Sequence, residues 1–140
     1  MTSTLSERED HIMVPDLREH VFGTLDFSRR DLAALNIQRG RDHGLPGYND
    51  IREAYGLPRV KWEEINTNQT NANPKLFDVI KAVRILYGNT SAPDNLDFFV
   101  GGLLETTFDG PGPLFRSILL DQFMRIRHGD RFWFENTHPK

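Results

Sequence analysis

Three polar side chains with binding chemistry recur at helical spacing between residues 32 and 43. Asn36, Arg39 and His43 follow Leu32 and Leu35 at intervals that place all five on one face of an α-helix. Burying an amide, a guanidinium or an imidazole without a partner costs about 1–3 kcal/mol for each group. An asparagine can orient the ring N–H of a histidine, and an arginine offers a planar fork to a carboxylate. The pattern therefore predicts a histidine or an acid-bearing cofactor opposite this face.

The same helix allows a second interpretation, in which the polar residues simply face water. Ala33, Ile37 and Gly40 also share one side, and burial of that side would leave the polar residues solvated. His43 by itself is weak support for a ligand site, because a lone histidine at a helix end is more often a cap or a satisfied core residue. The pattern alone leaves both interpretations open.

The element that must position these side chains is a helix of about four turns. Ser28 followed by Asp31 is a capping signature, which predicts that the helix begins at Ser28. Gly44 can adopt the left-handed conformation that ends a helix, and Pro46 blocks its continuation. We therefore expect a helix over residues 28–43.

Further helical segments are expected along the chain, and they predict a mainly α fold with about five or six helices and no significant sheet. The apolar stripes of the two longest ones are expected to be buried, and an aromatic triplet near the end is expected to plug the core. The helices are expected from Pro15 to Gly23, from Tyr48 to Gly56, for one turn at 61–65, at 73–87 and at about 113–128. The stripes are Leu76, Phe77, Ile80, Val83 and Tyr87, then Leu114, Phe115, Ile118, Leu119, Gln122, Phe123 and Ile126; the triplet is Phe132, Trp133 and Phe134.

The composition is that of one globular unit. The chain has 140 residues, of which 38% are hydrophobic and 26% charged, and this length predicts one domain. We expect residues 1–12 to be a poorly ordered lead-in and residues 13–140 to form the domain. A net charge of -3 without a basic cluster argues against nucleic acid as a partner. The chain has no cysteine, which excludes disulfides and thiolate metal sites.

Several other features limit the possible functions. No apolar run approaches the roughly 20 residues of a membrane span, so we expect no direct membrane insertion by this chain. Asp94, Asp97 and Glu105 are not spaced like a calcium loop, and we expect structural or surface roles for them and no metal site. Asn68 and Asn89 each begin a glycosylation sequon.

The run from Leu35 to Asn49 resembles the signature segment of the animal haem peroxidase superfamily. The resemblance extends from about Pro15 to Thr137, and the sequence of the matching segments is most similar to the peroxidase-like domain of dual oxidases. The further matching segments, in order, are Asp94–Asp97, Val100–Glu105, Gly112–Phe115, Asp121–Phe123 and Gly129–Asn136.

The resemblance implies haem as the cofactor and gives the residues of the helix face specific roles. It implies that Asn36 hydrogen-bonds the proximal histidine that ligates the iron, and that Arg39 pairs with a haem propionate. It also implies that Leu32 and Leu35 lie against the proximal face of the haem. The family's iron ligand, distal histidine and catalytic arginine match no position in this chain, so no catalytic residue is expected here. We expect the C-terminal part of a peroxidase domain, inactive alone.

The first functional expectation is therefore part of a hydrogen peroxide-dependent haem peroxidase, with the remainder of that domain as its partner. An alternative of another class is a non-catalytic, extracellular interaction module of a dual oxidase, which supports an NADPH oxidase membrane domain. A third is a free-standing helical binding protein. By resemblance, the expected location is extracellular or the extracellular side of a membrane protein.

Overall fold

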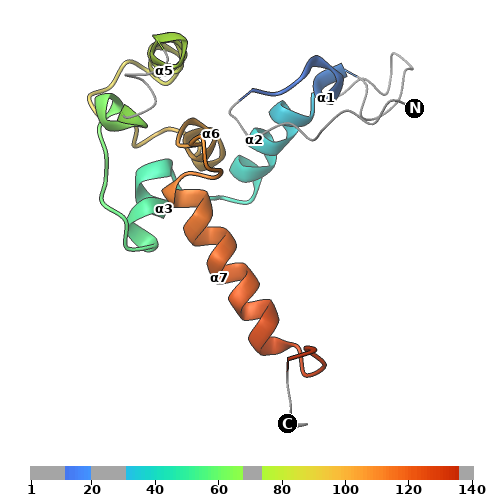
Figure 1. The fold of residues 1–140 in the computed structure, drawn as a ribbon. Helices are drawn as coiled ribbons and strands as arrows, with labels where there is room; N and C mark the ends of the chain where they lie inside the picture. The colour runs from blue at the N-terminus through green and yellow to red at the C-terminus, as the bar shows by residue number, and fades with distance from the viewer. Residues whose placement is uncertain (1–11, 20–30, 68–73, 136–140) are drawn as a thin grey trace.

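The structure is a computed structural model that describes residues 12–19, 31–67 and 74–135. Within those ranges every regular element is helical, and β pairing is limited to two isolated bridges. The predicted mainly α fold is confirmed, with six α-helices and one short 3-10 helix in the described part (Figure 1). The elements are α1 (Pro15–Glu19), α2 (Leu32–Asp42), α3 (Tyr48–Ala54), η2 (Trp62–Glu64), α5 (Pro74–Leu86), α6 (Phe98–Leu104) and α7 (Pro113–Gly129).

The core lies where α3, α5, α6, η2 and the first turn of α7 meet. Helices α3 and α6 pack against each other, and α7 starts beside them and then runs away from this body (Figure 1). Removing apolar surface from water is the main stabilising contribution here, at roughly 25 cal/mol per Å². The buried apolar side chains are Tyr48, Ile51, Trp62, Ile65, Leu76, Ile80, Leu96, Leu104 and Leu114.

Helix α6 approaches its neighbours closely because two of its residues lack a side chain. A Cβ atom at Gly101 would overlap the ring of Tyr48, and one at Gly102 would overlap the ring of Phe115. The sequence does not predict this helix, because two consecutive glycines lower local helix propensity. Packing of α6 between α3 and α7 outweighs that local cost.

Helix α2 begins later than predicted. Asp31 is its N-cap rather than a residue of its first turn, since its carboxylate accepts the backbone N–H of Ala34 at 3.1 Å. Ser28, the predicted cap, lies outside the described residues, as do the predicted end of the first helix at Gly23 and the lead-in up to residue 11. The other end agrees with the prediction, because Gly44 adopts the left-handed conformation with a φ of 66°.

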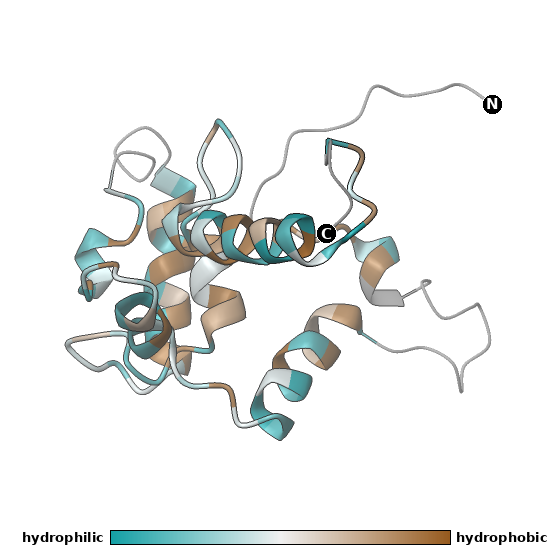
Figure 2. Ribbon diagram, turned by 90° about the horizontal axis from the view of Figure 1, so that it is seen from below, coloured by the Kyte–Doolittle hydropathy of each residue, from teal (hydrophilic) through white to brown (hydrophobic). Residues whose placement is uncertain are grey.

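The predicted burial holds only for the first turns of the last helix, and for the aromatic triplet it was wrong. Leu114 has no exposed surface and Phe115 and Ile118 are half-buried, but the stripe beyond Ile118 is exposed, and Phe132 and Phe134 are 77% and 83% exposed. Helical periodicity shows which side chains share a face, and not whether another element covers that face. Figure 2 shows apolar and polar residues interspersed along the whole length of α7. The exposed members of the predicted stripe are Leu119, Gln122, Phe123 and Ile126.

Helix α5 follows its predicted pattern except at one position. Leu76 and Ile80 are buried in the core, and Val83 and Tyr87 pack against them half-buried. Phe77 is 46% exposed instead, with the ammonium of Lys81 4.1 Å from the centre of its ring.

Candidate functional site

The residues predicted to form a site share one face of α2. Leu32, Leu35 and Asn36 are half-buried, whereas Arg39 and His43 are exposed. The side chains of Asn36, Arg39 and His43 have no hydrogen bond or ion pair with another residue of the described part of the chain. These polar groups are therefore available to a group that the described residues do not supply.

The neighbouring side of α2 packs against α6. Asn36, Ile37 and Gly40 line a small cavity together with Phe98 and Phe99. No residue of α2 is fully buried. Helix α2 thus contacts both α6 and α1, whereas the polar groups at the end of its second face have no hydrogen bond or ion pair with a described residue.

The side chains on this face of α2 suit one side of a haem. Leu32 and Leu35 offer apolar contact to a macrocycle, Arg39 offers a guanidinium fork to a carboxylate, and Asn36 offers an amide to an imidazole. The two described histidines do not face Asn36: His43 lies on the same face of the same helix, and His128 lies near the far end of α7. The residues present fit the proximal surroundings of a haem, without a described ligand for its iron.

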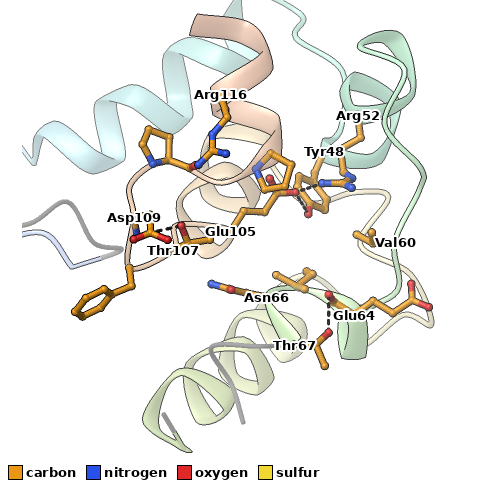
Figure 3. Close-up of a pocket in the computed structure, with 14 residues that line it drawn as sticks. Tyr48, Arg52, Val60, Glu64, Asn66, Thr67, Glu105, Thr107, Asp109 and Arg116 are labelled. Carbon is orange, nitrogen blue, oxygen red and sulfur yellow. Dashed lines mark hydrogen bonds and ion pairs between the residues drawn. The ribbon is translucent and has the colours of Figure 1, made fainter. Parts of the chain in front are cut away.

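A second polar cluster, which the sequence does not predict, lines an open pocket of about 600 Å³. Tyr48 and Arg52, one turn apart on α3, point toward Glu105 at the end of α6 (Figure 3). The Tyr48 hydroxyl donates to this carboxylate at 2.5 Å, and Arg52 forms an ion pair with it. The second carboxylate oxygen accepts the backbone N–H of Leu114 at 2.7 Å.

This cluster joins elements rather than offering a free acid or base. Burial, reinforced by the charge of Glu105, raises the pKa of Tyr48 far above its ordinary value, so that the hydroxyl stays protonated. Three donors from α3 and α7 saturate the carboxylate. Glu105 lies 53 residues from Arg52, so only the one-turn spacing of Tyr48 and Arg52 could have signalled the cluster in the sequence.

The three acids expected to have structural or surface roles each bind an arginine. Hydrogen bonds from Asn49 and Arg59 lower the pKa of Asp94, and a hydrogen bond from Arg41 lowers that of Asp97. In the described ranges no three acidic or histidine side chains gather as a metal site would need, and no helix there is long and apolar enough to cross a membrane. The pairs are Asp94 with Arg59 at 2.9 Å, Asp97 with Arg41 at 2.6 Å, and Glu105 with Arg52.

Comparison with known sequences matches the whole chain to one protein family. Residues 1–140 match the profile of the family described as animal haem peroxidase. The dual oxidase of Drosophila melanogaster is 47% identical over 137 residues, which cover 97% of this chain and 8% of that protein. Dual oxidase 1 of Homo sapiens is 47% identical over 138 residues, 98% of this chain and 8% of that protein. The chain thus spans a small part of the relatives it matches.

Solved structures share the fold. Peroxidase A from Dictyostelium discoideum superposes with a TM-score of 0.74 at 36% identity, over 94% of this chain and 24% of that one. A fatty acid alpha-dioxygenase from Oryza sativa, solved with palmitic acid, superposes with a TM-score of 0.60 at 29% identity, over 79% of this chain and 17% of that one. The likeness covers a segment of larger helical proteins in both cases.

Proposed function

This chain belongs to the animal haem peroxidase family, and we propose that it forms the proximal side of the haem site in a longer peroxidase domain. The observation that carries the proposal is the face of α2 on which Leu32, Leu35, Asn36 and Arg39 lie together, without partners for the polar groups in the described part. Asn36 is half-buried and Arg39 is exposed, so both polar groups can reach a group that packs on this face. The face is therefore suited to a cofactor and a histidine brought by another segment.

Each residue of the face has a distinct task in this proposal. The Asn36 amide accepts the ring N–H of the proximal histidine, which fixes the orientation of the imidazole and raises its basicity. The Arg39 guanidinium pairs with a propionate, and Leu32 and Leu35 exclude water from the macrocycle. When bound, haem would supply the redox chemistry that consumes hydrogen peroxide and oxidises a donor.

The remaining parts of the site come from a longer protein. We infer that residues 13–140 are the C-terminal part of the peroxidase domain, that the remainder of that domain is their direct partner, and that the isolated chain is inactive. The small share of each relative covered by this chain supports this, as does the open apolar surface of α7. An extracellular location and an NADPH oxidase membrane domain as a further partner follow from the similarity to dual oxidases, as proposals.

A chimera tests the site. Dictyostelium peroxidase A receives this chain in place of its matching segment, and Soret absorbance and peroxidase turnover are measured. Asn36→Ala should lower turnover by about 10- to 100-fold with the fold retained. Arg39→Ala should release haem faster. Gln38→Ala, on an exposed position of the same helix, and Arg125→Ala, on α7, are the matched controls and should change neither.

The same chimera separates the proposal from its alternative, a non-catalytic interaction module of a dual oxidase. That module predicts a folded chimera in which Asn36→Ala and Arg39→Ala behave like the controls. Unchanged turnover and haem retention in both variants would reject the proximal-site proposal.

A further inference from the structure

Helix α2, which carries the proposed site, packs against both α1 and α6. None of its residues is fully buried, and its apolar contact with α6 runs through Ile37 and Gly40 at a small cavity. The side-chain bond between Gln38 and Asp42 stays inside the helix. Because no side chain of α2 is fully buried, the orientation of α2 on the body also depends on its polar attachments.

One polar attachment joins α2 to α6 and α5. The Arg41 side chain donates from Nε to Asp97 Oδ1 at 3.0 Å and from Nη2 to Oδ2 at 2.6 Å, which is the two-pronged geometry of the strongest arginine–carboxylate pairs. The Tyr87 hydroxyl, just after α5, donates to the same Oδ2 at 2.6 Å. Asp97 immediately precedes α6 and its side chain is 15% exposed, whereas the Arg41 side chain is 57% exposed, so only the carboxylate is shielded from water.

The backbone is tied at the same point. The Tyr48 N–H donates to the Leu96 carbonyl at 2.8 Å, and Gly47 forms an isolated antiparallel bridge with Asp97. The segment between Arg41 and Tyr48 is thus attached to the start of α6 at both ends. Loss of the ion pair would free the α2 end of that segment while leaving the α3 end in place.

We propose that Arg41 and Asp97 are positioning residues, whose ion pair sets the angle of α2 on α6 and thereby presents Asn36 and Arg39 to the haem. Neither residue touches the cofactor in this scheme. The part of the inference that concerns haem rests on the proximal-site function proposed above, whereas the part that concerns the placement of α2 does not.

The placement is tested on the chain itself by amide hydrogen exchange. Arg41→Gln and Asp97→Asn should each speed exchange in α2 by about two- to fivefold, with the exchange of α3 and α6 unchanged. The double variant should exchange no faster than either single one, because the two residues act as one pair. Arg125→Gln, which breaks an exposed pair with Asp121 on α7, is the control and should leave α2 unchanged. Unchanged α2 exchange in both single variants would overturn the proposal.

The consequence for haem is tested in the peroxidase A chimera. Each single variant should release haem about two- to fivefold faster than the parent, the double variant no faster than either, and Arg125→Gln at the parental rate. Faster α2 exchange with parental haem release would overturn the positioning role. If instead Asn36→Ala and Arg39→Ala are without effect while α2 exchange responds as expected, the proximal-site function fails and the placement of α2 by the ion pair stands.

Discussion

Arg52 on α3 and Glu105 at the end of α6 form an ion pair whose two side chains are only 7% and 4% exposed. Removing one partner of a buried pair leaves a charge in a medium that solvates it poorly. The pair also connects three helices, because Glu105 accepts the backbone N–H of Leu114 at the start of α7.

Glu105→Gln should destabilise the chain by about 3–5 kcal/mol, because the amide keeps the shape of the side chain but leaves Arg52 unneutralised. The free energy of unfolding is measured by urea titration with circular dichroism. Asp121→Asn, which breaks the exposed pair with Arg125, should have little effect. Equal stability of the two variants would contradict a central role for the buried pair.

Alkaline pH should destabilise the chain through Tyr87. Burial raises the pKa of Tyr87 from 10.0 to about 12, and its hydrogen bond to Asp97 acts in the same direction. A raised folded-state pKa contributes stability that is complete below pH 10 and is lost as the pH rises through 12. Urea titrations between pH 8 and 12 should therefore show a smaller loss in Tyr87→Phe than in the parent. Tyr55→Phe, at an exposed tyrosine, should follow the parent curve; a Tyr87→Phe curve that also does so would refute this prediction.

The outer half of α7 should matter for assembly rather than for the stability of this chain. Phe123 is 64% exposed, so Phe123→Asp should change the free energy of unfolding of the isolated chain by no more than about 0.5 kcal/mol. In the peroxidase A chimera the same change should lower the yield of haem-loaded protein, because we expect the rest of the domain to pack on this apolar face. His128→Asp, at an exposed polar position of the same helix, is the control. A normal yield for Phe123→Asp would show that the rest of the domain leaves this face open.

Asn89 should carry an N-linked glycan if the protein is exported as proposed. It begins the sequon that ends at Ser91, it is exposed, and it lies in a left-handed turn after α5 with a φ of 53°. The chain is secreted from a eukaryotic cell in an Asn68→Gln background, and its mobility is compared before and after peptide N-glycosidase. Asn89→Gln and Ser91→Ala should abolish the mobility change, whereas Ser91→Thr should retain it. If peptide N-glycosidase does not change the mobility of the secreted protein, Asn89 is not glycosylated. Asn68 itself lies outside the described residues.

Local features of the sequence were sufficient for much of the fold. Pro15, Pro74 and Pro113 begin the helices expected of them, and Gly44 ends α2, because capping and termination depend on residues within one turn. The resemblance to haem peroxidases was visible for the same reason, since its longest matching run is contiguous. The shared face of Asn36 and Arg39 likewise follows from helical spacing alone, and its role in haem binding stays a prediction.

Only the tertiary structure decided which of these faces are covered and which distant residues meet. Arg41 and Asp97 are 56 residues apart and Arg52 and Glu105 are 53 apart, so no periodicity could pair them. The two glycines of α6 argue against a helix locally, yet they allow the close packing that stabilises it. The outer stripe of α7 has the spacing of a buried face but is exposed. Burial depends on whether another segment packs on that face, which spacing does not show. Spacing along a chain determines the direction of a side chain, whereas its surroundings depend on segments far away in the sequence.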